Sequence, residues 1–190
     1  MPVLTRRSLL AGAGLLLLGA CGGPELANVA PVSFAGRPPI RLNVARIDTV
    51  DRAAPSATML AQSPATAIRG WGAARLQAAG RTGIGQLIIQ QASLTQERLA
   101  TQGGLTSVFN DQPSLKLTLR LAARLEVGAV GNITGGYADV SVERSTTLTD
   151  GSSAADQSRA EAGLLQDGMG EFDRQFEANI RQYLAPLVLP

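Results

Sequence analysis

The chain has 190 residues, of which 45% are hydrophobic, so it has enough apolar material for one packed core and is not a disordered protein. It contains no histidine and one cysteine, which excludes an internal disulfide, metal sites built on imidazole or thiolate clusters, and catalytic triads with a histidine base. The formal charge is +2, but residues 1–20 contain Arg6 and Arg7 and no acidic residue. The remaining chain is formally neutral and lacks the dense basic surface that nucleic-acid binding requires.

The first 20 residues have the three parts of a signal peptide. Arg6 and Arg7 make its start positive, residues 9–18 are apolar, and Gly19 and Ala20 are the small residues that a signal peptidase needs. The continuous apolar stretch of about 12 residues is shorter than the roughly 20 residues of a membrane-spanning helix. We therefore predict that residues 1–20 are a leader that is removed.

The end of this leader matches the lipobox of bacterial lipoproteins, with Leu18, Gly19 and Ala20 as the recognition residues before Cys21. In that pattern the cysteine thiol accepts a diacylglycerol group, and the new N-terminus is acylated by a chain such as palmitate. Several acyl chains on one residue anchor a protein stably, since each buried CH₂ contributes about 0.8 kcal/mol. The alternative is an ordinary cysteine in an apolar segment. The order of the segments favours lipidation at Cys21, and we expect no other cofactor and no metal.

The leader leaves the export route open. Residues 5–10, with Arg6 and Arg7, fit the pattern of a twin-arginine signal, and a general secretory leader with two adjacent arginines fits equally. Gly22 follows the cysteine where aspartate would retain an enteric lipoprotein in the inner membrane. We therefore expect the periplasmic face of the outer membrane, with retention in the inner membrane as the alternative.

The chain after Cys21 divides into a tether and one domain. Residues 22–39 contain four prolines and are predicted to be extended. The predicted organisation is therefore a signal peptide over 1–20, a lipidated tether over 21–39 and a single domain over 40–190.

Hydrophobic periodicity predicts four strands and a first helix. The strands cover residues 40–50, 87–99, 115–127 and 138–143, the first with a register break at Ile47, and the last two form an antiparallel hairpin around Gly131. The helix begins at Ser63-Pro64, where serine is the N-cap, and runs to Gly80. Trp71 lies on its apolar face and is predicted to be a core residue over the sheet.

A long C-terminal helix follows a capping box at residues 153–156 and ends at Pro186. Its apolar stripe consists of Leu165, Met169, Phe172, Phe176, Ile180, Tyr183 and Leu187. Such a stripe covers the Leu-rich face of a sheet. The order β-α-β-β-β-α predicts an α+β sandwich, with a mainly antiparallel sheet covered on one face by two helices.

No residue pattern in the domain indicates an enzyme. The acidic pairs Asp139/Glu143 and Glu171/Asp173 read as solvated surface on a strand and on a helix. The glycines at residues 80–85 precede a strand, whereas a phosphate site needs them before a helix. The serines have no histidine to activate them. We therefore predict a non-catalytic protein.

The lipobox and the order of elements resemble the lipopolysaccharide-assembly lipoproteins of the outer membrane and the auxiliary lipoproteins of lipid-transporting ABC systems. Residues 38–45, Pro-Pro-Ile-Arg-Leu-Asn-Val-Ala, resemble the start of alphaproteobacterial envelope lipoproteins. The resemblance implies a membrane-anchored accessory in envelope assembly or in lipid or lipopolysaccharide transport. Its partner would be an envelope membrane protein or transport complex that contacts the sheet edge or loops. The alternative hypothesis is a module that binds an amphiphile between the sheet and the C-terminal helix, near Trp71.

Overall fold

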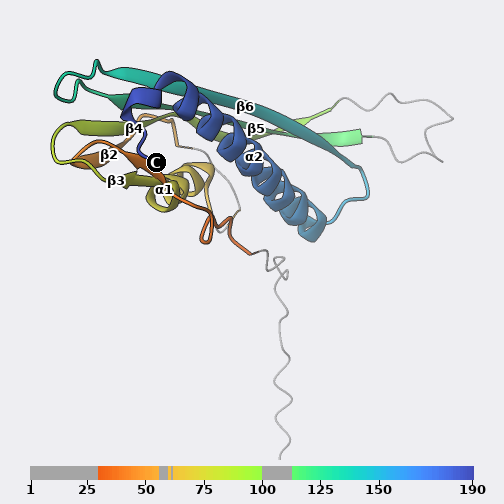
Figure 1. Ribbon diagram of the computed structural model, residues 1–190. Helices are drawn as coiled ribbons and strands as arrows, with labels where there is room; N and C mark the ends of the chain where they lie inside the picture. The colour runs from red at the N-terminus through yellow and green to blue at the C-terminus, as the bar shows by residue number, and fades with distance from the viewer. Residues whose placement is uncertain (1–29, 56–59, 61, 100–112) are drawn as a thin grey trace, which may run out of the picture.

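The computed structural model describes residues 30–55, 60, 62–99 and 113–190. In chain order its elements are β1 (Ile40–Leu42), β2 (Arg46–Asp51), α1 (Pro64–Arg75), β3 (Leu76–Ala78), β4 (Ile84–Arg98), β5 (Pro113–Val127), β6 (Gly136–Thr149), α2 (Ala154–Tyr183) and the short 3₁₀ helix η2 (Ala185–Leu187). The molecule is an α+β sandwich in which both helices pack on one face of the main sheet (Figure 1). The predicted fold class is confirmed.

The main sheet has four strands in the order β2-β4-β5-β6. β2 pairs parallel with β4, and α1 lies on the connection between them, as a parallel pair requires. β4, β5 and β6 form an antiparallel meander, which confirms the predicted hairpin of the two long strands. A second, two-stranded sheet is made by the parallel pair β1 and β3.

The predicted strand over residues 40–50 is two strands in different sheets. The chain turns at residues 43–45, where the Val44 N–H donates to the Leu42 carbonyl at 2.8 Å. Gly80 packs directly against this turn. A Cβ on Gly80 would lie 2.5 Å from the Asn43 carbonyl carbon and 2.6 Å from the Val44 nitrogen, so only glycine fits there.

The first helix is shorter than predicted, because α1 ends at Arg75 and not at Gly80. Its start is as expected, since the Ser63 hydroxyl accepts a hydrogen bond from the Thr66 N–H at 3.2 Å. Leu76 is already extended, and β3 pairs with β1 with Leu76 opposite Ile40. Pairing with β1 overrides the helical periodicity.

The capping box of α2 is confirmed. The Ser153 hydroxyl accepts from the Asp156 N–H, and the Asp156 carboxylate accepts from the Ser153 N–H. The apolar stripe is buried from Leu165 to Ile180. Tyr183 departs from it, since it is 61% exposed at the end of the helix.

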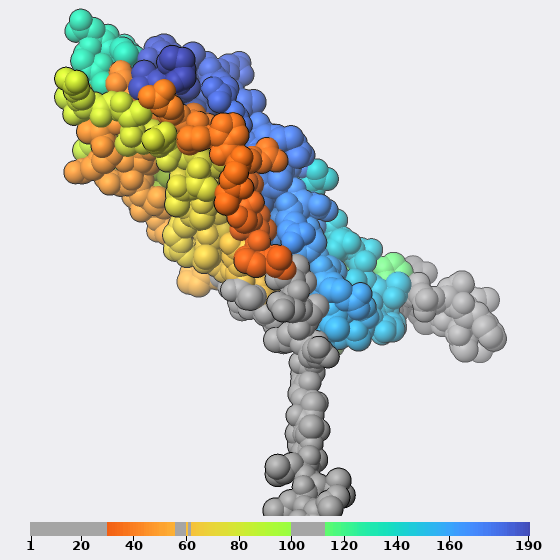
Figure 2. Space-filling model, turned by 60° about the horizontal axis from the view of Figure 1, so that its bottom comes forward, coloured from red at the N-terminus to blue at the C-terminus, as the bar shows by residue number. Residues whose placement is uncertain are grey.

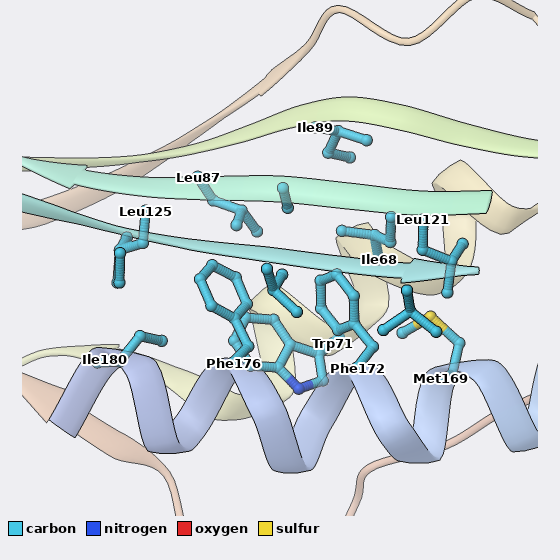
Figure 3. Close-up of a cluster of buried hydrophobic side chains, with 14 of the residues drawn as sticks. Ile68, Trp71, Leu87, Ile89, Leu121, Leu125, Met169, Phe172, Phe176 and Ile180 are labelled. Carbon is cyan, nitrogen blue, oxygen red and sulfur yellow. The ribbon is translucent and has the colours of Figure 1, made fainter. Parts of the chain in front are cut away.

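The core lies between the sheet and the two helices (Figure 3). From the sheet it receives alternate residues of β4, β5 and β6, and from the helices it receives aromatic and aliphatic side chains. Trp71 is fully buried and contacts Phe172 edge-on at 5.4 Å and Phe176 in a stacked arrangement at 5.0 Å between ring centroids. The prediction that Trp71 is a core residue is confirmed.

Candidate functional site

The residues predicted for export and lipidation are not among the described ones. They are Arg6, Arg7, Leu18, Gly19, Ala20 and Cys21. Their roles stay predictions, and the structure contributes the place where the chain after them joins the domain.

That junction is the N-terminal segment, residues 30–39, which the sequence assigns to the tether. It packs on the domain and lies in the seam between α1 and α2 (Figure 2). Phe34 is 8% exposed and belongs to the core, and the Val32 N–H donates to Gln62 Oε1 at 2.8 Å. Contact with the folded part of the chain therefore begins before Ile40, because Phe34 supplies an apolar ring that the core can bury.

A buried polar group, here called the Asp173 cluster, holds this segment to both helices. Asp173 on α2 is completely buried, and its Oδ1 accepts from Trp71 Nε1 at 2.7 Å and from Arg75 Nε at 2.8 Å. Its Oδ2 faces Arg37 NH1 of the N-terminal segment at 2.9 Å. Arg75 is 1% exposed and also donates to the Pro38 carbonyl and to the Glu177 carboxylate.

The prediction that Asp173 lies on an exposed helix face is wrong. The sequence feature that indicates the burial of Asp173 is Arg75, which follows Trp71 by four residues on the apolar face of α1. A buried guanidinium requires a buried carboxylate as its partner. Asp173, next to Phe172 on the apolar side of α2, is the carboxylate in the right position.

The contacts of the Asp173 cluster are those of a structural ion-pair network. The guanidinium of Arg75 is held by a carboxylate, a second carboxylate and a backbone carbonyl, so its charge is already compensated. The cluster ties together residues that are about a hundred positions apart in the sequence. It therefore fixes how the chain leaves the domain toward residue 30.

The space around Trp71 is filled by aromatic rings. Phe172 and Phe176 also contact each other, at 5.3 Å, so three rings close the gap between α1 and α2 (Figure 3). A hollow of about 230 Å³, lined in part by Arg69, Ala73 and Leu76, lies on the other side of α1 toward β2. The place that the sequence suggested for an amphiphile is thus occupied by side chains.

A larger hollow lies at the end of the sheet where β4 ends, β5 begins and α2 starts. It has a volume of about 450 Å³. We call it the near-end cleft, and its described lining consists of Gln96, Arg98, Leu99, Ser114, Leu115, Asp150 and Gln157. Its lining combines polar and charged side chains with two leucines.

Directly behind the near-end cleft lies a buried carboxylate. Glu161 of α2 is 1% exposed, and its Oε1 accepts from the two lining amides, Gln96 Nε2 at 2.6 Å and Gln157 Nε2 at 3.2 Å. Within the described part of the chain, Glu161 Oε2 has no hydrogen-bond partner. A buried carboxylate oxygen without a donor is costly, which marks this position as unusual.

The outer face of the sheet, which neither helix covers, carries cross-strand ion pairs between β5 and β6. Arg124 makes two hydrogen bonds to Asp139, at 2.7 and 2.9 Å, and Arg120 makes two to Glu143, both at 3.1 Å. The guanidinium of Arg124 also lies 4.2 Å above the ring of Tyr137. The hydrogen bond to Asp139 raises the pKa of Arg124 above its usual value. Asp139 and Glu143 are surface residues as predicted, and the pairing with arginine was not predicted.

The opposite end of the domain, here called the far end, contains the β5–β6 turn and the end of α2. The described large hydrophobic side chains that are exposed all lie here, namely Ile84 at 41%, Tyr137 at 55% and Tyr183 at 61%. Ile84 opens β4 and its carbonyl accepts from the Gly128 N–H of the turn, and Tyr183 lies next to Gly136 at the start of β6. Exposed tyrosines are typical of protein interfaces.

Neither α1 nor α2 combines the length and the apolar character needed to cross a membrane. In residues 30–55, 60, 62–99 and 113–190, no group of three or more cysteine and carboxylate side chains is arranged to hold a metal ion.

Comparison with known proteins gives distant similarities. No family model and no curated protein matches the sequence. A minor lipoprotein from Acinetobacter baumannii is similar in structure with 13% identity and a TM-score of 0.37, over 78% of this chain and 98% of that one. Rare lipoprotein B from Shewanella oneidensis is similar with 12% identity and a TM-score of 0.35, over 70% and 92%. These TM-scores are too low to support a conclusion about function.

Proposed function

We propose that this protein is an envelope lipoprotein, anchored through acyl chains on Cys21, that serves as a non-catalytic accessory to an envelope membrane protein or transport complex. The single observation that carries the anchor is the lipobox, Leu18-Gly19-Ala20-Cys21, after a positive and then apolar leader. Assembly of the envelope or transport of lipid or lipopolysaccharide is the process in which we place it.

The distance between the anchor and the domain supports this proposal. From Cys21 to Ala30 the chain spans at most about 30 Å when fully extended. At Ala30 it already contacts the domain, because Gln166 Nε2 of α2 donates to the Ala30 carbonyl at 3.3 Å. The Asp173 cluster then holds residues 37 and 38 against both helices. The domain is thus kept near the membrane with its first residues fixed to its own surface.

The position of the exposed tyrosines supports a partner at the far end. Tyr183 follows Gln166 on α2 by 17 residues, about 26 Å along the helix axis. The segment from Ala30 to Asn43 runs along α2 in the same direction, since Asn43 N–H donates to the Leu187 carbonyl at 2.8 Å. The far end therefore points away from the anchor, where a membrane protein of the envelope or its soluble part can contact Tyr137 and Tyr183.

Site-specific photo-crosslinking in cells tests the partner. A photoreactive phenylalanine analogue replaces Tyr183 or, separately, Tyr137, and the matched control carries it at Arg159, an exposed residue near the start of α2. We expect a discrete crosslinked envelope protein from the far-end positions and none from Arg159. No crosslinked envelope protein at either tyrosine, with the protein present in the membrane fraction, would contradict the accessory role.

A further inference from the structure

We propose that the near-end cleft binds the phosphate–ammonium zwitterion of a phosphoethanolamine group. The inference deepens the proposed function, on which it rests, because the anchor at Cys21 would keep this cleft close to a membrane surface. It also retains the idea of an amphiphile ligand but moves its site from Trp71, where the core is filled, to the start of α2.

The first observation is a pair of unpaired charges of opposite sign. Arg98 at the end of β4 and Asp150 after β6 both line the cleft and both are exposed. In the part of the chain that the structure describes, neither forms an ion pair, with the other or with any other side chain. A ligand that carries an anion and a cation a few ångströms apart can compensate both.

The second observation is the buried carboxylate of Glu161. Its Oε2 lacks a donor, and its Oε1 is held by Gln96 and Gln157, whose side chains separate it from the cleft. Both glutamines donate through Nε2, so their carbonyl oxygens are acceptors that take no hydrogen bond from another described residue. A primary ammonium has three N–H donors, which suits a site made of Asp150 and the two amide oxygens, with the buried Glu161 carboxylate behind them.

The two opposite charges in the lining assign the two ends of the ligand. The guanidinium of Arg98 is the group that binds a phosphate, with its planar fork of donors. The acceptors at Asp150 and around Glu161 bind the ammonium. Leu99 and Leu115 give the cleft an apolar part, which fits the carbon atoms that follow the phosphate in a lipid.

The cleft also lies on the side of the domain where the chain leaves toward the anchor. Gln157, in its lining, precedes Gln166 by nine residues, about 14 Å along α2, and Gln166 contacts Ala30. A headgroup in the membrane surface is therefore within reach of the cleft. Free phosphoethanolamine has the same chemistry, so the experiment must distinguish the two sources.

The first arm measures binding of soluble O-phosphoethanolamine to the mature protein, extracted from membranes in detergent, by isothermal titration calorimetry. We expect saturable binding, and we expect Arg98→Gln and Asp150→Asn each to weaken it about tenfold or more, because each removes a charged hydrogen-bond partner. Phosphocholine, which has no N–H donor on its nitrogen, should bind at least about tenfold more weakly.

Matched variants distinguish the loss of a charge in the cleft from the loss of a charge elsewhere on the protein. Lys116→Gln removes a cation at the same end of β5 that does not line the cleft, and Asp167→Asn removes an exposed carboxylate of α2. Both should bind as the wild type does. Glu161→Gln should also weaken binding, and thermal unfolding of this variant shows whether it still folds. If Glu161→Gln does not fold, the surface variant Asp150→Asn still tests the proposal.

The second arm is native mass spectrometry of the protein extracted from membranes that contain phosphatidylethanolamine and phosphatidylglycerol. Retained phosphatidylethanolamine, lost in Arg98→Gln, identifies the lipid headgroup as the source. Binding in the first arm without retained lipid supports the zwitterion site and identifies the free compound as the source. Inorganic phosphate binding as tightly as phosphoethanolamine, or no binding in either arm, would overturn the proposal. The first arm does not depend on lipid at Cys21, so its failure is distinct from failure of the anchor.

Discussion

Two groups of arginine–carboxylate pairs lie on opposite sides of the same sheet. On the covered side, the Asp173 cluster is buried and joins the N-terminal segment, α1 and α2. On the open side, Arg120 pairs with Glu143, with side chains 42% and 60% exposed. The same kind of pair thus occurs both in a low-dielectric interior and in water. Burial, more than geometry, therefore decides how much such a pair contributes to stability.

The two groups also differ in what they connect. The outer pairs join neighbouring strands of a hairpin that is already held by its ladder of hydrogen bonds. The Asp173 cluster joins segments that are held together by few other polar contacts, and it fixes the path of the chain toward the anchor. We therefore expect substitutions in the cluster to affect the whole domain and substitutions in the outer pairs to have small effects.

The largest effect is expected for Asp173→Ala, which would leave the guanidinium of Arg75 buried without its main partner. We expect a loss of about 3–5 kcal/mol in the free energy of unfolding, measured by urea denaturation. Asp167→Ala on the exposed side of α2 is the control and should change it by less than about 0.5 kcal/mol. Equal denaturation midpoints for Asp173→Ala and the wild type would show that the buried cluster contributes no more to stability than an exposed ion pair.

A second substitution, Trp71→Phe, sharpens the account of the cluster by keeping an aromatic ring and removing the indole N–H. Asp173 then loses the hydrogen bond of 2.7 Å from Trp71 Nε1 but keeps Arg75. We expect a loss of about 1–3 kcal/mol in the free energy of unfolding. A loss as large as that of Asp173→Ala would show that packing of the ring, and not the polar cluster, dominates.

The capping box of α2 gives an intermediate effect with a defined pH dependence. Ser153→Ala should cost about 1 kcal/mol of stability at neutral pH. Hydrogen bonds from Ser153 lower the pKa of Asp156 in the folded protein. The contribution of this carboxylate is therefore present above its unfolded pKa, near 3.9, and is lost as the pH falls through the lower folded value. Urea denaturation at pH 7 and at acid pH should show a smaller difference between variant and wild type in acid; a constant difference would contradict this assignment.

The smallest effect is expected on the open side of the sheet. A double-mutant cycle with Arg120→Ala and Glu143→Ala should give a coupling of about 0.2–1 kcal/mol that decreases in high salt, because the pair is largely in water. A coupling of several kcal/mol that salt does not change would mean that this exposed pair behaves like the buried one.

Much of the fold could be predicted because it follows from local patterns. The alternation over residues 115–127 predicted β5, and Ser153 and Asp156 predicted the start of α2. The break of the first strand and the early end of α1 could not be predicted, because they depend on β1 pairing with β3 across the chain. Hydrophobic periodicity indicates which face of a segment is buried. It does not indicate which strand a short strand pairs with.

The candidate sites divide in the same way. Cys21 is predicted from a contiguous motif, whereas Asp173 was misjudged because its partners are Trp71 and Arg75 about a hundred residues earlier. The near-end cleft combines residues from three elements, and Glu161 has no distinguishing neighbour in the sequence. Arg75, a cation on the apolar face of α1, could have indicated a buried carboxylate, but no prediction was drawn from it.

The anchor is tested most directly by the intact mass of the protein extracted from membranes, measured beside a Cys21→Ser variant. The account predicts a mature chain that begins at Cys21 and carries diacylglycerol and a further acyl group, and it predicts that the variant lacks both the lipid and this cleavage. A full-length chain without lipid, or a mature chain that starts at another residue, would contradict the account.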